Sequence, residues 1–411
     1  MNLLKKYSQS TFFFILLFFV LSLLIPKFSI FNNLIELPTN YKLPVAKNIT
    51  FFTQWLIEDA TLGIFTFKEF TRAIGSILDI PSTFLKGLLA TGFKFETANG
   101  GTIFIEPFSW ISVIFVFVMI GVWLKDISLS IFVAISFFYV ALFDLWESTM
   151  TTFSSIIVAV IIGIIFGTFL GILSYKFHRI NNILTPTFDF MQTMPVFAYL
   201  VPALMLFGYG PAAALIVTLI YAMPPMARVT KNALDQVNSE VIELGQMVGC
   251  STFQMLKKVL LPSIKPRMML GVNQVIMLTL NMVIIASMIG AGGLGYDVWQ
   301  SLKQLRIGQG FEAGIAITLV AIVLDRLSQK IASRKQDYDY KNIDFFQKYK
   351  FLILSFFVII FSWLVGQKYS FLITLPENLT FSSGRFWDNI IDYININFHD
   401  SINLVRYFFF I

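Results

Sequence analysis

The side chains that most often carry out covalent or metal chemistry are scarce in this sequence. There is one cysteine, Cys250, and the two histidines, His178 and His399, lie far apart. One cysteine cannot form a disulfide within the chain, and two distant histidines lack the spacing of a metal site. The run from Gly290 to Gly295 is rich in glycine, but no Gly-Lys-Ser/Thr ending of a phosphate loop occurs in the chain. The sequence therefore predicts no catalytic, metal or cofactor site.

A second group of residues indicates passage of a solute. Uncharged polar side chains and a proline interrupt two long apolar runs. They are Gln192, Pro195, Tyr199, Asn273, Gln274, Asn281 and Ser287. Gln192 and Tyr199 lie seven residues apart, as do Gln274 and Asn281, so each pair shares one helix face. Unpaired polar groups are costly in hydrocarbon, so these faces should look into the bundle or toward water. We expect them to line a translocation path, with Tyr199 available for a cation–π contact. The alternative is that they hydrogen-bond between helices and hold the bundle together.

The elements that carry these residues require a membrane. The chain of 411 residues is 56% hydrophobic and 13% charged, with 46 phenylalanines, whereas soluble domains carry about 25% charged residues. Too little polar material is left to cover a water-facing surface, which excludes a soluble enzyme. A membrane-crossing helix needs about 20 apolar residues. Candidate runs lie at roughly 11–26, 107–124, 127–146, 151–175, 188–208, 211–226, 268–290, 309–325 and 351–366. The sequence predicts an all-α polytopic membrane bundle with about 8–9 transmembrane helices.

The distribution of basic residues orients these helices in the bilayer. The net charge is +6, but the lysines and arginines lie in loops between apolar runs, which indicates a lipid bilayer as the partner and no nucleic acid. If the N-terminal lysines are cytoplasmic, alternation places the 176–179 turn, the 227–267 loop and the 326–350 loop on the same side. All of these are basic. The turns at 148–150 and 209–210, assigned to the outer side, contain no basic residue.

The loop at 227–267 is the one long polar segment that joins two apolar helices on the predicted cytoplasmic side. Ser239 precedes a short helical segment that stops at Gly249, the residue type that most easily takes the left-handed conformation ending a helix. The segment Ser251-Thr-Phe-Gln254 has the spacing of a capping box and starts a second helix, which we expect Pro262 to break. The sequence predicts two short helices at an angle, joined at Gly249-Cys250.

The same segment resembles the signature loop of bacterial binding-protein-dependent ABC importer permeases. That motif reads E-A-A, three residues, G, nine residues, I-x-L-P. Glu243, Gly249, Leu261 and Pro262 fall on its positions, and Val259 replaces the isoleucine. Leu244 and Gly245 stand where the family has alanines. In the family, this loop docks into the ATPase subunit. The resemblance implies that the coupling residues are Glu243, Leu244, Gly245, Gly249, Cys250, Ser251, Leu261 and Pro262.

Five further segments extend the resemblance to the glycine betaine/proline betaine (quaternary amine) permease subfamily. They are Met191–Pro202, Ala222–Thr230, Gly271–Gln274, Met282–Gly295 and Ile322–Leu327, within about residues 105–330. The resemblance implies an ABC type I importer permease core in the bacterial inner membrane, carrying glycine betaine, proline betaine, choline or dimethylsulfoniopropionate. It implies that ATP is hydrolysed by a separate cytoplasmic subunit in two copies and that this chain is not an enzyme. A periplasmic substrate-binding protein and a second permease core, as a homodimer or in tandem, complete the expected assembly.

The chain then divides into four regions. They are an N-terminal membrane anchor at 1–26, a periplasmic amphipathic segment at 27–106, the permease core at 107–330, and a region at 331–411 with a cytoplasmic linker, an extra transmembrane helix and a periplasmic tail. The first apolar run could be a cleaved signal peptide, but its flank Ile25-Pro26-Lys27 lacks a small-x-small cleavage site, which favours an uncleaved anchor.

Two segments outside the core keep alternative interpretations. Apolar residues recur at helical spacing from Phe67 to Ile77 and from Trp387 to Phe398. Each segment is either an amphipathic helix on the outer membrane face or a helix packed on the neighbouring bundle. For the C-terminal region, one hypothesis is the first part of a tandem permease, and the alternative is a family-specific tail on the outer membrane face.

Two other functions compete with an ATP-driven permease. A secondary transporter driven by an ion gradient should carry acidic residues inside the membrane and inverted repeats, and only Asp144 and Asp325 come close. A membrane scaffold protein without transport would not need a cytoplasmic docking loop.

Overall fold

The structure is a computed structural model that describes residues 44–61, 63–96, 101–333, 345–366, 369–373 and 375–399. The chain divides into two compact units, Met1–Thr66 and Phe67–Ile411. In the first, helix α3 (Val45–Glu58) precedes an isolated antiparallel bridge between Thr61 and Thr66. The apolar run expected at 11–26 lies outside the described residues.

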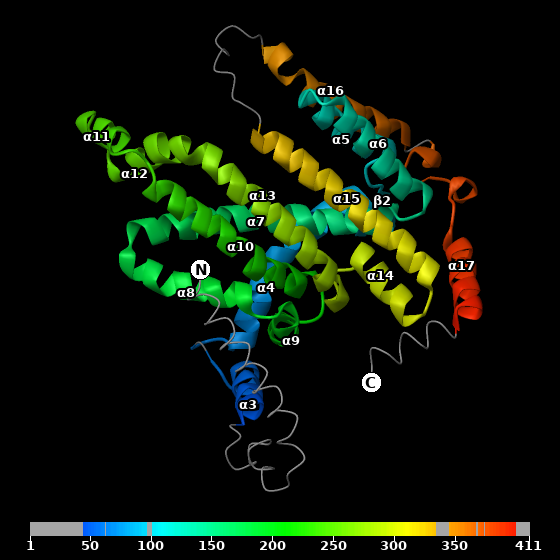
Figure 1. Cartoon of the computed structure of the whole chain (residues 1–411), viewed down its shortest axis with the longest axis horizontal. Helices are drawn as coiled ribbons and strands as arrows, with labels where there is room; N and C mark the ends of the chain where they lie inside the picture. The colour runs from blue at the N-terminus through cyan, green and yellow to red at the C-terminus, as the bar shows by residue number, and fades with distance from the viewer. Residues whose placement is uncertain are drawn as a thin grey trace, which may run out of the picture. The chain divides into compact units, whose positions relative to one another are not determined.

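The second unit is a helical bundle with one two-stranded hairpin (Figure 1). Its first part holds α4 (Phe67–Lys86), the π-turn η4 (Gly87–Thr91), β1 (Phe93–Glu96), β2 (Thr102–Ile105), α5 (Trp110–Trp123), α6 (Ile127–Leu142), α7 (Trp146–Lys176), α8 (His178–Thr193), α9 (Val196–Phe207) and α10 (Pro211–Asp235). Its second part holds α11 (Ser239–Met247), α12 (Thr252–Gln254), η5 (Met255–Leu260), α13 (Leu261–Ala286), η6 (Ser287–Ile289), α14 (Leu294–Lys303), α15 (Ile307–Ser333), α16 (Phe345–Gly366), η8 (Ser370–Leu372), η9 (Glu377–Leu379) and α17 (Gly384–Asn397). The hairpin pairs Phe93 with Ile105 and Glu96 with Thr102.

Helices α7, α10 and α13 cross at the centre of this unit (Figure 1). Small residues let them approach closely. A Cβ added to Gly167 of α7 would lie 2.6 Å from the Met226 Cβ of α10, and one added to Gly171 would lie 2.6 Å from the Ala227 carbonyl oxygen. Gly163, one turn earlier, faces Val275 of α13. Glycines four residues apart are the usual means of close helix packing in membranes, where the hydrophobic effect does not drive helices together.

Within the described residues, five helical segments are long and apolar enough to cross a membrane. They are 67–91, 146–176, 211–235, 252–289 and 307–333. Four of these lie at predicted spans, whereas 67–91 lies in the segment predicted to be amphipathic and periplasmic. Trp110–Trp123, Ile127–Leu142 and Lys350–Gly366 are shorter apolar helices at three further predicted spans.

The run expected to cross as one helix at 188–208 does not do so. Helices α8 and α9 are bent by 104° relative to each other. Pro195 lies at the break and disfavours a helical conformation of the preceding residue, and Met194 is indeed extended, with ψ of 137°. The prediction of a single span at 188–208 underestimated this effect, because it placed Pro195 within one continuous helix.

Contacts near the ends of the helices agree with the predicted alternation across the membrane. On the predicted outer side, the Gly210 amide donates to the Ile289 carbonyl at 3.2 Å, and the Leu294 amide donates to Thr152 Oγ1 at 2.9 Å. On the predicted inner side, Lys330 Nζ lies 3.0 Å from the Asp126 carboxylate. Each contact therefore joins segments that the charge pattern assigns to one face.

Helix α4 packs on the bundle. The Thr71 hydroxyl donates to the Leu206 carbonyl at 2.7 Å, and a Cβ added to Gly75 would lie 3.3 Å from the Ala212 Cβ. Helix α4 also contacts α7, α9 and α10. Of the two interpretations of the Phe67–Ile77 periodicity, the structure favours packing on the neighbouring bundle.

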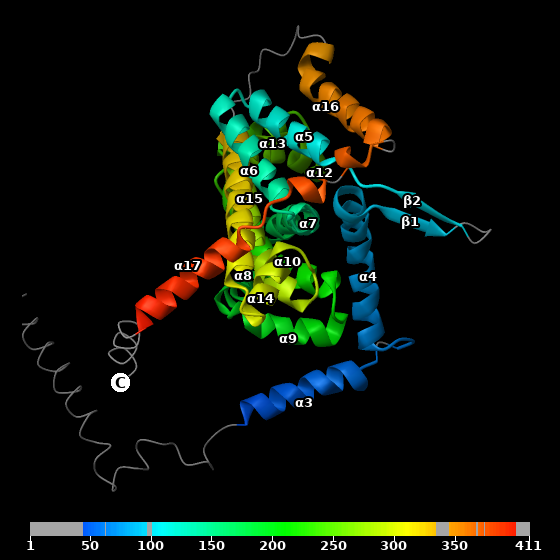
Figure 2. The same cartoon turned by 90° about the vertical axis from the view of Figure 1, so that its right-hand side faces the viewer.

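The region after α15 is also attached to the bundle. Helix α16 lies along α5 (Figure 2), and the Trp363 indole donates to the Glu106 carbonyl at 3.4 Å. The Ser109 hydroxyl donates to the Leu372 carbonyl. Farther on, α17 packs on α15, where the buried Glu312 carboxylate accepts hydrogen bonds from the amide and hydroxyl of Ser383. The described part of the C-terminal region thus packs on α5 and α15.

Candidate functional site

The turn between α11 and α12 has the geometry expected of a rigid joint. Gly249 has φ of 76°, in the left-handed region, and its amide donates to the Gln246 carbonyl at 2.9 Å. The Cys250 amide donates to the Gly245 carbonyl at 3.0 Å. These bonds satisfy carbonyls that the end of α11 leaves free. The predicted helix end at Gly249 is confirmed.

The second helix starts as the sequence predicts but does not end as predicted. The Gln254 amide donates to Ser251 Oγ at 3.3 Å, and the Ser251 amide donates to Gln254 Oε1 at 3.0 Å, which completes a capping box. The expected break at Pro262 is wrong, because the helix runs without interruption from Thr252 to Ile289. The wide turns of η5 precede Pro262 and accommodate a residue that has no N–H to donate.

The base of the loop is fixed by apolar packing. Leu260 and Ile264 are buried against Ala233 and Leu234 of α10, and Leu261 packs on this cluster. Gly245 is buried as well, and a Cβ there would lie 2.6 Å from the Met255 Cε. Helix α11 is therefore held against η5 through a position that has no side chain.

The residues around the joint at Gly249 form an exposed apolar surface. Met247 is 86% exposed, more than any other methionine among the exposed apolar residues of the described chain. Three other large apolar side chains near the joint are also exposed. We call the four residues the apolar tip: Leu244, Met247, Val248 and Phe253. Glu243 and Ser251 are exposed beside it. Because exposed apolar clusters mark interaction surfaces, the tip is a candidate docking surface for another protein.

Three of the predicted path residues meet in one pocket. Its volume is about 470 Å³, and its lining comes from α8, α10 and α13. The polar lining residues are Gln192, Arg228, Asn232, Asn273 and Gln274. We call this the polar pocket. The Asn273 side-chain oxygen also accepts a hydrogen bond from the Ser328 hydroxyl of α15, so this residue ties helices together as well.

The other predicted path residues lie elsewhere. The Tyr199 hydroxyl donates to the Met191 carbonyl at 2.8 Å, which fastens α9 to the last turn of α8. Ser287 is fully buried and its hydroxyl donates to the Val283 carbonyl at 2.6 Å. Pro195 forms the break between α8 and α9, and Asn281 is exposed without lining the polar pocket. The sequence left open whether Tyr199 lines the path or bonds between helices. The hydrogen bond to Met191 favours the role between helices.

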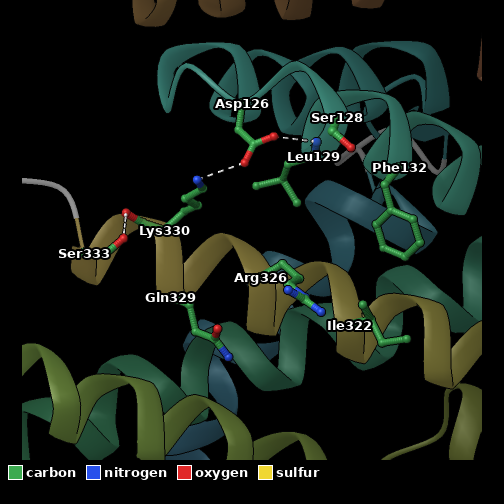
Figure 3. A pocket seen from close by; sticks show the side chains of 9 residues that line it. All are labelled: Asp126, Ser128, Leu129, Phe132, Ile322, Arg326, Gln329, Lys330 and Ser333. Carbon is green, nitrogen blue, oxygen red and sulfur yellow. Dashed lines mark hydrogen bonds and ion pairs between the residues drawn. The ribbon is translucent and has the colours of Figure 1, made fainter.

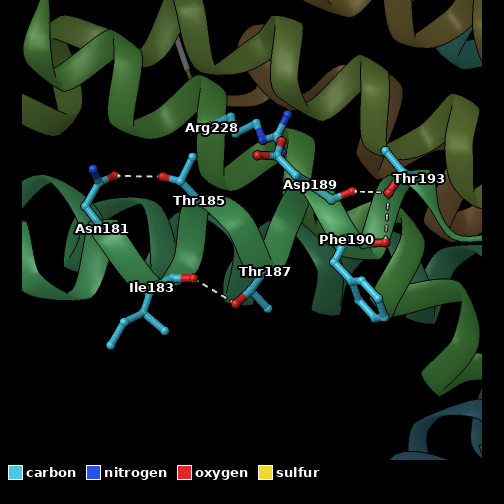
Figure 4. A network of polar contacts seen from close by, with 8 residues as sticks. All are labelled: Asn181, Ile183, Thr185, Thr187, Asp189, Phe190, Thr193 and Arg228. Atoms are coloured by element: carbon cyan, nitrogen blue, oxygen red, sulfur yellow. Dashed lines mark hydrogen bonds and ion pairs between the residues drawn. The ribbon is translucent and has the colours of Figure 1, made fainter.

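An ion pair that the sequence did not predict includes one residue of this pocket. Arg228 of α10 lies 2.6 Å from the Asp189 carboxylate of α8. Figure 4 shows both side chains between the two helices, whereas the Thr187 and Thr193 hydroxyls of α8 donate back to carbonyls of their own helix. The two charged residues lie 39 positions apart, so only the fold pairs them. The signal in the sequence was a charged residue at the edge of each apolar run, Asp189 near the start of 188–208 and Arg228 just after 211–226.

A second pocket lies between the inner ends of α6 and α15 (Figure 3), with a volume of about 590 Å³. Asp126 caps α6 there by accepting from the Leu129 amide at 3.0 Å, and it also contacts Lys330. The hydrogen bond from the Leu129 amide, followed by that from Lys330, lowers the pKa of the Asp126 carboxyl below its ordinary value. This pocket holds an ion pair that fastens one helix turn to another helix.

Comparison with known proteins agrees with the geometry of the loop and the bundle. Residues 159–337 match the family model described as binding-protein-dependent transport system inner membrane component. The trimethylamine N-oxide transport system permease protein of Pelagibacter ubique is 38% identical over 296 residues, which cover 70% of this chain and 41% of that protein. The chain thus spans less than half of that relative's length.

Two other relatives are bacterial betaine permeases. The glycine betaine transport system permease protein of Bacillus subtilis is 35% identical over 295 residues, covering 72% of this chain and 96% of that protein. The glycine betaine/proline betaine transport system permease protein of Escherichia coli is 39% identical over 218 residues, covering 53% of this chain and 62% of that protein. With almost the whole Bacillus protein matched, and with the predicted helix joint at Gly249 in place, this chain belongs to the family of binding-protein-dependent transport system inner membrane components.

Proposed function

We propose that this chain is the transmembrane permease subunit of an ATP-driven ABC importer for small zwitterionic osmolytes. The observation that carries the proposal is the loop at 239–262, where a capped, rigid joint presents the apolar tip on the predicted cytoplasmic side. An ion-driven transporter or a scaffold has no need of such a surface. The names of the relatives support the same class of function.

The loop is suited to transmit force. An ATPase that closes on ATP can shift the permease between conformations only if its open and closed states contact the loop differently. Helix α11 rests on η5, and η5 continues into α13, which lines the polar pocket through Asn273 and Gln274. A displacement at the tip therefore reaches the pocket through one continuous helix. Pro262, accommodated without a break, leaves that helix intact.

The proposed assembly has several other members. A second permease core, from another copy or in tandem, completes the path. Two cytoplasmic ATPase subunits bind the loops at 239–262 of the two cores. A periplasmic binding protein delivers the substrate. The proposed substrates are glycine betaine, proline betaine, choline and dimethylsulfoniopropionate. Trimethylamine N-oxide is added because the Pelagibacter relative is named for its transport.

Uptake by the complete complex tests this function. The chain is reconstituted in liposomes with its co-purifying ATPase and binding protein, and uptake of labelled glycine betaine is measured in competition with the other four compounds. We expect uptake that requires ATP hydrolysis and is competed by at least one of them. Uptake that follows an ion gradient without ATP, or none at all, would contradict the proposal.

A further inference from the structure

Arg228 lines the polar pocket among uncharged amide side chains, and its ion-pair partner Asp189 lies outside that lining. We propose that the polar pocket is a transient binding site for the oxygen anion of the substrate. In it, Arg228 binds the substrate's carboxylate or N-oxide oxygen. This inference rests on the proposed function, because it names a site for the substrate of that transport.

The hydrogen-bonding state of Arg228 favours an anionic ligand. One of its terminal nitrogens contacts the Asp189 carboxylate at 2.6 Å. Its Nε is buried and, within the described residues, has no hydrogen-bond partner. A buried donor without an acceptor is unfavourable. A ligand in the pocket reaches the terminal nitrogens of the guanidinium, because the Arg228 side chain is 38% exposed although its Nε is not. These nitrogens can donate to a carboxylate in charge-assisted hydrogen bonds.

The remaining lining completes a site for a small anion-bearing molecule. Gln192 and Gln274 add side-chain amides that can donate to the same oxygens. Arg228 is the one cationic residue among the described residues of the lining. The volume, about 470 Å³, lies in the usual range for small-molecule pockets.

The cationic end of the ligand is held differently. None of the described residues that line the polar pocket is aromatic, so a cation–π cage is not formed there. The Asp189 side chain is more than half exposed, so its attraction for a cation is screened by water. The site should therefore discriminate by the oxygen anion and bind weakly, as a site that must release its ligand requires. Glycine betaine should bind better than choline, which has a hydroxyl in place of the carboxylate.

The competing explanation is that the ion pair only fastens α8 to α10. The chain offers a control for the removed charge, because Lys231 and Asp235, also 2.6 Å apart, form a pair within α10 outside the pocket lining. Asp189→Asn separates the two explanations further. It breaks the same ion pair but leaves Arg228 free, so a fastening role predicts that it acts like Arg228→Gln. The proposal predicts that binding of the oxygen anion survives.

Protection of a cysteine from labelling measures binding at the site independently of transport. Asn232 is exposed and lines the pocket, so Asn232→Cys in a Cys250→Ser background is labelled with a small thiol reagent in the purified permease–ATPase complex. Glycine betaine should slow labelling more effectively than choline does, while sucrose should not. Arg228→Gln should raise the glycine betaine concentration needed by about tenfold or more, the equivalent of a hydrogen bond to a charged group. Lys231→Gln and Asp189→Asn should retain protection.

Several results would overturn the inference. They are equal protection by glycine betaine and choline, no protection in the Asn232→Cys complex, unchanged protection in Arg228→Gln, or loss of protection in Asp189→Asn. Melting curves of each variant complex show whether a loss reflects unfolding. ATP-driven uptake by the unmodified complex is measured separately, so a failure of the site is distinguished from a failure of the proposed function.

Discussion

At the residue scale, the account depends most on the backbone of Gly249. Its φ of 76° costs a residue with a side chain about 1–2 kcal/mol. A Cβ there would meet no atom within 4 Å, so a substitution acts through the backbone and not through a steric clash. The conformation orients α11 relative to the helix that starts at Thr252, and with it the apolar tip.

We predict that Gly249→Val reduces substrate-stimulated ATP hydrolysis and uptake while the chain still inserts in the membrane. A β-branched side chain disfavours the left-handed conformation and should reorient the tip. Gly249→Asn is the matched control, because asparagine tolerates this conformation and should retain most activity. Both activities are measured in liposomes that hold the whole complex. Wild-type uptake by the valine variant would refute the coupling role.

The sequence predicts the structural role of a residue when its contact partners lie close to it in the chain. The capping box of Ser251 and Gln254 and the helix end at Gly249 depend on neighbours within a few positions, and both are present. The ion pair of Arg228 and Asp189 depends on how α8 folds back beside α10. No local pattern encodes that arrangement, so the pair could not be predicted.

At the scale of elements, two prolines behave in opposite ways. Pro195 separates α8 from α9, which are bent by 104°, whereas Pro262 lies within a helix that runs from Thr252 to Ile289. The sequence favours the reverse, one continuous span through Pro195 and a break at Pro262. The outcome depends on whether the preceding turns can widen, as η5 does before Pro262, and on the packing around them. Residue type alone does not determine it.

The contact of α7 with α10 provides a test of element packing. Gly167→Ala should lower the thermal midpoint of the purified complex, because the added Cβ would lie 2.6 Å from the Met226 Cβ and 3.0 Å from the Met223 carbonyl oxygen. Overpacking of this kind costs about 1–3 kcal/mol. Gly314→Ala in α15 is the control, since a Cβ there meets no atom within 4 Å. Equal midpoints for the two variants would show that α7 and α10 are not so tightly packed.

The Asp126–Lys330 contact predicts a pH-dependent link between α6 and α15. The pKa of the Asp126 carboxyl is lowered in the folded protein, so its stabilising effect is present above the unfolded pKa of about 3.9 and is lost as the pH falls through the folded pKa. Asp126→Asn should therefore lower the thermal midpoint at neutral pH, and the difference from wild type should shrink on acidification. A difference that is absent at neutral pH, or that grows in acid, would contradict this.

At the scale of the whole molecule, composition and charge predict the fold class and the sides of the membrane better than they predict single contacts or helix breaks. The apolar runs and the distribution of lysine and arginine predict a polytopic bundle, and the contacts near the helix ends agree with the predicted sides. They do not predict how α16 and α17 attach to α5 and α15. Those contacts use backbone carbonyls and single side chains such as Trp363 and Glu312, which leave no periodic pattern.

The central claim is that the apolar tip is held from the cytosol by an ATPase subunit. Its most direct test is a photo-crosslinking amino acid placed at Met247, the most exposed residue of the tip, in cells that express the whole complex. The account predicts a covalent adduct with a nucleotide-binding ATPase subunit, in a yield that changes when ATP hydrolysis is blocked. It is contradicted if no such adduct forms, or if an impermeant reagent labels Met247→Cys in a Cys250→Ser background from outside intact cells.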